Sequence, residues 1–301
     1  MKFRTIGLIG YGEVGKIFSA GLQGKDGVEA RNGVSAWDRK FVGDTAAVEL
    51  AHAEAAGVTA RMSSKALCEA SDLVIAAVTA SQSLAVSQEA ARYMRPGSVY
   101  LDLNSASPGT KQRSATLIEA AGARYVEAGV MTSVPPYGIK VPLLLGGESA
   151  GELALLLAAW GMDAKAVSEK LGVASAIKMC RSVMIKGMEA LVIESYATAR
   201  AYGVEDYVIP TLEETFPNMD WQKTGAYFFS RVVQHGQRRA EEMREAANTV
   251  REAGFEPYMT DSIADKQQWV ADEAKAGVFR DVGKDASWQD YADRLLATRP
   301  K

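Results

Sequence analysis

An apolar segment that runs directly into a glycine-rich turn opens the chain. Residues 5–9 read Thr-Ile-Gly-Leu-Ile, and Gly10, Gly12 and Gly15 follow with the spacing Gly-x-Gly-x-x-Gly. In this pattern the first glycine permits a tight turn, the second lets the backbone approach a pyrophosphate, and the third lets the next helix pack closely on the strand. The free N–H groups at the start of that helix would hold the anion. The pattern predicts a strand, a turn and a helix that bind a dinucleotide through Gly10, Tyr11, Gly12, Glu13, Val14 and Gly15.

A second expected strand supports this prediction and bears on which dinucleotide is bound. Residues 33–38 read Gly-Val-Ser-Ala-Trp-Asp, and Asp38 lies 23 positions after Gly15, where a carboxylate that binds ribose hydroxyls is expected. Its charge would repel the additional phosphate of NADP, which favours NAD. Arg39 keeps NADP open as the alternative, because a guanidinium could pair with that phosphate or stack on adenine. We expect NAD or NADP as the cofactor, with NAD favoured.

Strand and helix patterns alternate through the first part of the chain. Continuous apolar runs such as residues 73–78 indicate parallel strands that are covered on both faces. We therefore expect residues 1–168 to form an α/β domain with a doubly wound sheet of the Rossmann type. Residues 174–201 then contain no proline and a single glycine, which predicts a long helix that joins the domains. Strand signals are scarce beyond it, so residues 172–301 are expected to form an all-α domain for substrate binding and dimerisation.

Composition and charge argue against several kinds of partner. The 301 residues carry a formal net charge of −3, which gives no general attraction to nucleic acid or to an anionic membrane. The longest apolar run, residues 153–162, is far shorter than the roughly 20 residues of a membrane span. Cys68 and Cys180 are the only cysteines and lie in no Cys/His cluster, so no metal site is expected. The first strand begins by about Phe3, which leaves no room for a signal peptide. We expect a cytoplasmic protein that acts on a small-molecule substrate.

The start of the long helix carries a candidate acid/base. Helical spacing places Lys178, Arg181 and Ser182 on one face, and apolar side chains surround them in the sequence. Desolvation in a closed apolar cleft lowers the pKa of a lysine toward the range where it exchanges protons at neutral pH. The alternative is an ordinary exposed lysine near the start of a helix.

Four motifs, in this order along the chain, resemble the β-hydroxyacid dehydrogenase family, which includes 3-hydroxyisobutyrate and 6-phosphogluconate dehydrogenases. They are residues 10–15, Asp102-Leu-Asn104-Ser105, Glu127-Ala-Gly-Val-Met131-Thr132 and Gly172-Val-Ala-Ser-Ala-Ile-Lys178-Met179. The resemblance implies that Lys178 is the general acid/base and that Asn104 and Ser105 lie beside the nicotinamide and the substrate. It also implies that the cofactor is lined by Val78 and Thr79, and that the substrate is faced by Met131 and Thr132.

Departures from the family pattern indicate a rebuilt substrate site. Relatives usually carry Ser-Gly-Gly where residues 131–133 read Met-Thr-Ser, and an asparagine where this chain has Ser182. Phosphogluconate-type enzymes carry a glutamate seven residues after the lysine, where Ile185 stands here, which argues against oxidation of 6-phosphogluconate. The segment 134–138, Val-Pro-Pro-Tyr-Gly, resembles a branch of the family with a C-terminal helical domain of its own. Arg181 could hold a substrate carboxylate through two parallel hydrogen bonds, or form a salt bridge between domains.

The main expectation is an NAD(P)-dependent oxidoreductase that transfers a hydride between nicotinamide and a small hydroxy acid or the corresponding oxo compound. His235 could reach the substrate from its own or a partner subunit, although a lone helical histidine is more often a packing or surface residue. The long helices, rich in alanine and methionine, suggest a homodimer. The first alternative is an imine or pyrroline reductase, because the residues at 131 and 182 suit a less anionic substrate. The second is a dinucleotide-binding sensor without catalysis.

Overall fold

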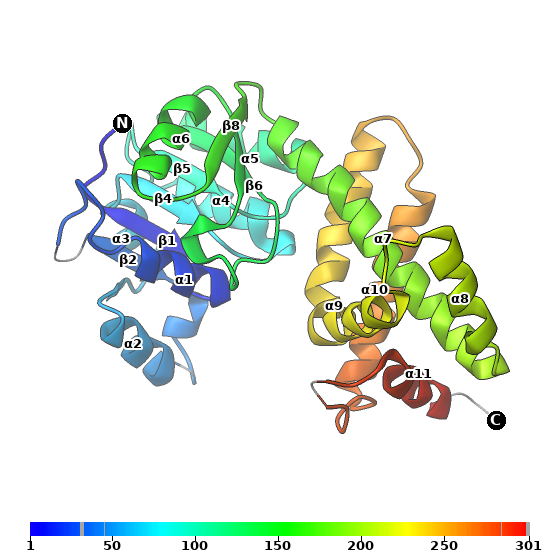
Figure 1. Ribbon diagram of the computed structural model, residues 1–301. Coiled ribbons are helices and arrows are strands. Elements are labelled where there is room, and N and C mark those ends of the chain that lie inside the picture. The colour runs from blue at the N-terminus through cyan, green and yellow to red at the C-terminus, as the bar shows by residue number, and fades with distance from the viewer. Residues whose placement is uncertain (31–32, 45, 284, 299–301) are drawn as a thin grey trace. The chain divides into compact units, whose positions relative to one another are not determined.

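The computed structural model describes residues 1–30, 33–44, 46–283 and 285–298 (Figure 1). The chain forms two compact units, Met1–Met179 and Cys180–Lys301. The boundary between them lies within one helix, α7 (Val173–Tyr202).

The first unit is built on an eight-stranded sheet with the order β3-β2-β1-β4-β5-β6-β7-β8. Its strands are β1 (Ile6–Ile9), β2 (Val34–Trp37), β3 (Thr59–Ala60), β4 (Leu73–Ala76), β5 (Val99–Asp102), β6 (Arg124–Val130), β7 (Leu143–Gly146) and β8 (Ala164–Ser168). Neighbouring strands are parallel except β6 and β7, which are antiparallel. The order reverses between β1 and β4, because the chain first adds β2 and β3 on one side of β1. This arrangement confirms the expected doubly wound α/β sheet.

Helices cover both faces of this sheet, as its apolar strands require. They are α1 (Glu13–Gly21), α2 (Ala46–Ala55), α3 (Ser64–Cys68), α4 (Ser83–Ala91), α5 (Pro108–Ala120) and α6 (Ala150–Ala159), with the short 3-10 turns η1 (Arg39–Phe41), η2 (Ala80–Gln82) and η3 (Gly138–Lys140). Alternate residues of β4 show the two-sided burial. Leu73 and Ile75 belong to one hydrophobic cluster, whereas Val74 and Ala76 belong to another.

The described residues of the second unit form helices joined by turns and loops, with no strand among them. It contains the remainder of α7 together with α8 (Glu205–Thr215), α9 (Trp221–Glu252), α10 (Tyr258–Lys275) and α11 (Trp288–Ala297). Its core is rich in aromatic residues, with Tyr196 against Trp288 and Phe229 stacked on Tyr291. Within the described ranges no helix combines the length and the apolar character that a membrane crossing needs.

Candidate functional site

The glycine-rich turn lies at the carboxyl end of β1, beside the point where the strand order reverses. Gly10 has φ +99°, and a Cβ atom there would lie 2.3 Å from the carbonyl oxygen of Ala77. A Cβ atom on Gly15 would lie 1.9 Å from the carbonyl oxygen of Gly10, so α1 packs directly on the turn. A Cβ atom on Gly12, by contrast, would meet no described atom within 4 Å. The turn is therefore closed at its two ends and open above Gly12.

The start of α1 has the properties of an anion site. Among the described residues no side chain caps this helix at Gly12, and the N–H groups of a first helical turn have no acceptor within the helix. Those N–H groups and the positive end of the helix dipole favour a bound anion. Val14 is half-buried, whereas Glu13 is exposed in the first turn. The open space over Gly12 and these unpaired donors fit the pyrophosphate of a dinucleotide.

Asp38 ties the glycine turn to the end of β2. Its Oδ2 accepts a hydrogen bond from the Tyr11 backbone N–H at 2.6 Å, and its Oδ1 accepts one from the Lys40 backbone N–H at 2.9 Å. The spacing of Asp38 from the glycine turn predicted a carboxylate that binds ribose, but it did not indicate that this carboxylate also holds the turn. Arg39, the first residue of η1, is exposed.

The Tyr11 side chain is buried in the core of the first unit. Its ring lies 5.3 Å from that of Phe41, and its hydroxyl oxygen lies 3.1 Å from Nδ1 of His52. Burial raises the pKa of the Tyr11 phenol. A dinucleotide in the turn would therefore meet the main chain of Tyr11, while its side chain anchors the turn to α2.

Asn104 joins the ends of two neighbouring strands. Its Oδ1 accepts the backbone N–H of Val78 at 2.7 Å, and its Nδ2 donates to Ser83 Oγ at 3.4 Å. Asn104 is buried, Val78 is half-buried and Thr79 is exposed beyond β4. The structure therefore brings Val78, Thr79 and Asn104 together at the carboxyl ends of β4 and β5.

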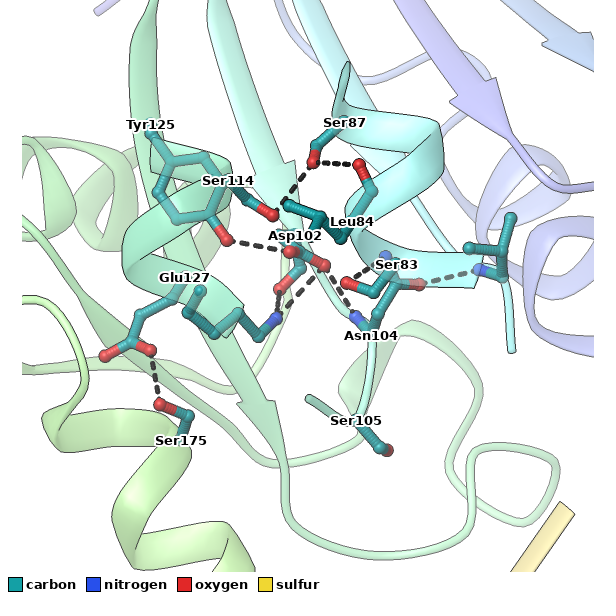
Figure 2. A network of polar contacts seen from close by, with 12 residues as sticks. Ser83, Leu84, Ser87, Asp102, Asn104, Ser105, Ser114, Tyr125, Glu127 and Ser175 are labelled. Atoms are coloured by element: carbon teal, nitrogen blue, oxygen red, sulfur yellow. Dashed lines mark hydrogen bonds and ion pairs between the residues drawn. The ribbon is translucent and has the colours of Figure 1, made fainter. Parts of the chain in front are cut away.

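A buried ion pair supports the loop that carries Asn104 (Figure 2). Asp102 Oδ1 lies 3.0 Å from Lys111 Nζ and accepts the Asn104 backbone N–H at 2.9 Å. Asp102 Oδ2 accepts the Tyr125 hydroxyl at 2.7 Å, and Lys111 Nζ also donates to the Asp102 carbonyl at 2.8 Å. Both charged side chains are inaccessible to solvent. Burial raises the pKa of Tyr125 well above its ordinary value, and the nearby Asp102 carboxylate raises it further.

Lys178 and Ser105 meet within the first unit. Lys178 Nζ donates a hydrogen bond to Ser105 Oγ at 2.5 Å, and both residues are half-buried. A Cβ atom on Gly129 of β6 would lie 2.9 Å from the Ala174 carbonyl oxygen and 3.4 Å from Lys178 Cβ, so the first turns of α7 pack closely on the sheet. Two residues that lie 73 positions apart in the sequence are thereby placed in contact.

The remaining predicted substrate residues are more dispersed. Met131 is half-buried just after β6, where its N–H donates to the Pro142 carbonyl at 3.0 Å, and Thr132 is exposed. Further along α7, Arg181 is exposed and Ser182 is buried, and His235 lies on α9. These last three belong to the second unit, and their roles in binding substrate stay predictions.

Two buried acidic residues support this site, and their sequence motifs indicated no role for them. Asp102 and Glu127 are register partners in β5 and β6, and each follows buried apolar residues in its strand. An acidic residue inside an apolar run is the signal that could have identified them, because such a residue is rarely buried without a partner. Within the described residues, no group of three or more His, Cys, Asp or Glu side chains could hold a metal ion.

Family models match both parts of the chain. The NAD-binding domain of 6-phosphogluconate dehydrogenase matches residues 5–148, and a domain of unknown function matches residues 199–270. The first match covers the glycine turn, Asp38 and Asn104.

Solved structures with this fold extend over nearly the whole chain. A conserved hypothetical protein from Sinorhizobium meliloti is 34% identical with a TM-score of 0.75, over 97% of this chain and 96% of its own. The 3-hydroxyisobutyrate dehydrogenase of Mycobacterium tuberculosis, solved with L-serine, is 19% identical with a TM-score of 0.70, over 98% and 99% of the two chains. An imine reductase of Aspergillus terreus, in complex with NADPH4 and dibenz[c,e]azepine, is 19% identical with a TM-score of 0.55, over 92% and 95%. At these lower identities the likeness is one of fold.

Proposed function

Because this chain belongs to the β-hydroxyacid dehydrogenase family, with an NAD-binding domain like that of 6-phosphogluconate dehydrogenase, we propose that it transfers a hydride between a bound nicotinamide and a small hydroxy acid or the corresponding oxo compound. The observation that carries this proposal is the hydrogen bond from Lys178 Nζ to Ser105 Oγ at 2.5 Å. It supports the proposal because the amine of Lys178 lies beside the loop that leads from β5 into α5. A substrate hydroxyl in this region would have an acid/base within the same unit as the glycine turn.

The chemistry divides between the cofactor and Lys178. When bound, the nicotinamide accepts the hydride in one direction and supplies it in the other. In oxidation, the neutral amine of Lys178 takes the hydroxyl proton as the C–H bond on the same carbon breaks and a C=O bond forms. In reduction, the Lys178 ammonium returns a proton to the oxygen. Ser105 accepts a hydrogen bond from Nζ and so orients the amine, while Asn104 holds the ends of β4 and β5 together.

Replacement of Lys178 tests this mechanism. A panel of hydroxy acids is screened by absorbance of the reduced nicotinamide, and Lys178→Ala is expected to lower kcat for the best substrate about 10²- to 10⁴-fold. Binding of the reduced cofactor, followed by its fluorescence, is expected to stay unchanged. Lys165→Ala, at an exposed lysine of β8 in the same unit, serves as the control and should keep wild-type kcat. Near wild-type kcat in Lys178→Ala would exclude the assigned role.

Reduction of imines is the second candidate activity. The Met131 side chain and the Ser182 hydroxyl suit a less anionic substrate than a hydroxy acid, and an imine reductase shares the fold. Parallel assays with cyclic imines and with hydroxy acids, under the same cofactor, discriminate between the two. A faster turnover of imines by at least tenfold would favour the reductase.

We also propose NAD as the favoured cofactor, and the Asp38 carboxylate at the end of β2 supports this choice.

We propose a cytoplasmic location as well. The free thiols of Cys68 and Cys180 support it, because they fit a reducing compartment. Burial raises the pKa of the Cys68 thiol to about 12, so this residue is inert at neutral pH.

We further propose a homodimer that forms through the second unit. Apolar side chains are exposed on this unit, among them Leu191 and Tyr202 of α7. Both residues line a groove of about 410 Å³ together with Val204 and Val208. Exposed apolar side chains that lie next to one another can form an interaction site on a protein.

A further inference from the structure

Glu127 is a fully buried carboxylate for which the proposed chemistry has no use. It lies in the middle of β6, between Val126 and Ala128, and its side chain is 0% exposed. Burial of a carboxylate in an apolar sheet is unfavourable unless its oxygens accept hydrogen bonds. The partners of this carboxylate therefore indicate what it does.

In the described part of the chain, the hydrogen-bond partners of Glu127 lie at the start of α7, the helix that carries Lys178. Figure 2 shows the contact with Ser175. Glu127 Oε1 accepts the backbone N–H groups of Gly172 at 2.8 Å and Ala174 at 3.0 Å. Glu127 Oε2 accepts the Ser175 hydroxyl at 2.7 Å. The carboxylate thus satisfies N–H groups that a helix start leaves without an acceptor, and its charge is favourable at the positive end of the helix dipole.

Two glycines, one in β6 and one in β7, leave room for the contact between Glu127 and α7. Gly146 of β7 is the register partner of Glu127, and a Cβ atom there would lie 2.5 Å from Glu127 Oε1. Gly129 lies two residues beyond Glu127 in β6, and a Cβ atom there would lie 2.9 Å from the Ala174 carbonyl oxygen. Larger residues at 129 or 146 would therefore displace either the helix or the carboxylate.

Glu127 caps α7 from a distant part of the sequence, unlike the serine caps of other helices in the first unit. Ser63 caps α3 and Ser107 caps α5, and each residue directly precedes its own helix. Such a cap stabilises a helix end but moves with it. Glu127 is 45 to 48 residues away from the groups that it binds, on a strand inside the sheet. It therefore fixes the first turn of α7 relative to the sheet.

We propose that Glu127 is the positioning residue that sets Lys178 against Ser105. The N–H of Ala174 donates to Glu127, and Ala174 lies four residues before Lys178. The turn that Glu127 holds is therefore the helical turn directly before the lysine. The hydrogen bond from Lys178 to Ser105 depends on how that turn is rotated about the helix axis and where it lies along the axis. Glu127 determines both. The inference rests on the proposed function, in which Lys178 is the acid/base.

The test compares Glu127→Ala, Glu127→Asp and Glu127→Gln by a measurement that needs neither cofactor nor substrate. Lysines are labelled with dinitrofluorobenzene over a range of pH, and the rate at Lys178 is read by peptide mass spectrometry, with exposed Lys165 as the internal reference. Glu127→Ala removes the carboxylate, and Glu127→Asp draws it back by one methylene. Both changes should release the Lys178 amine and raise its labelling rate toward that of Lys165. In both variants kcat for the best substrate should fall about 10- to 100-fold, because small misplacements of a catalytic group have large effects.

Glu127→Gln is expected to rescue the geometry. Its amide oxygen can accept the two backbone N–H groups, and its NH2 can donate to the Ser175 oxygen, because that hydroxyl also has the Gly172 carbonyl as an acceptor at 3.1 Å. Labelling and kcat should then stay within about threefold of wild type, with an unchanged pH profile of kcat. Ser63→Ala, which removes an ordinary cap in the same unit, should lower thermal stability and leave Lys178 labelling unchanged.

The outcomes separate this inference from the proposed function. If Lys178→Ala keeps its turnover, the acid/base assignment fails whatever Glu127 does. If Lys178→Ala is inactive while Glu127→Asp matches wild type in both labelling and pH profile, the positioning role of Glu127 is overturned. An equal rise in Lys178 labelling in Ser63→Ala would also overturn it, because the effect would then be a general loosening of the unit. Should Glu127→Ala fail to fold, Glu127→Asp decides.

Discussion

At the scale of the residue, Asp38 combines two functions that can be separated by experiment. Its carboxylate holds the Tyr11 N–H of the glycine turn and, in our proposal, discriminates against the 2′-phosphate of NADP. Asp38→Asn removes the charge but keeps one acceptor oxygen, so the affinity for NADPH relative to NADH should rise about tenfold, as measured by nicotinamide fluorescence. Asp44→Asn, at a nearby exposed aspartate, should leave the ratio unchanged. An unchanged ratio in Asp38→Asn, with a selective loss of NADPH binding in Arg39→Ala, would instead assign a phosphate contact to Arg39.

At the scale of the element, the Asp102–Lys111 pair joins the end of β5 to α5 and supports the Asn104–Ser105 loop. Lys111→Met leaves a buried carboxylate without its cation, and should lower the free energy of unfolding by about 3–5 kcal/mol in urea denaturation followed by circular dichroism. The double variant Asp102→Asn/Lys111→Met has no unpaired charge and should recover a large part of that loss. A single variant within about 1 kcal/mol of wild type would show that the pair contributes little.

For the whole molecule we predict association into a homodimer through the second unit. Leu191 is 58% exposed and lines the groove of the second unit, so Leu191→Glu should shift the proposed homodimer toward monomer in size-exclusion chromatography with light scattering. The matched control is Leu155→Glu, which introduces the same charge at a 76% exposed leucine of α6 in the first unit. This control should remain dimeric. A wild-type protein that is monomeric at micromolar concentration would contradict the proposal.

Much of the first unit was predictable because its signals are local. The apolar run of β1, the glycines that follow it and the continuous apolar run of β4 each lie within a few residues, and each matches one secondary structure. The approximate places of Asp38, Asn104 and Lys178 followed from strand ends, from a helix start and from the family resemblance. The expected domain limits, 1–168 and 172–301, and the roles of the site residues stay predictions.

Other features of the site depended on which elements become neighbours. Nothing near Glu127 in the sequence indicates that its carboxylate meets the start of α7, since its partners lie 45 to 48 residues away. The burial of the Tyr11 side chain in the core, against Phe41, likewise could not be predicted from the sequence.

Periodicity and motif spacing are properties of adjacent residues, so the class of the sheet, the glycine turn and the family could all be predicted from the amino-acid order. The pairing of the charged residues inside β5 and β6 depends on the three-dimensional fold. This pairing holds the Asn104–Ser105 loop and the start of α7 in place. The physical reason is that a buried charge takes its partner from whichever element packs against it, and that neighbour is set by the fold of the whole unit.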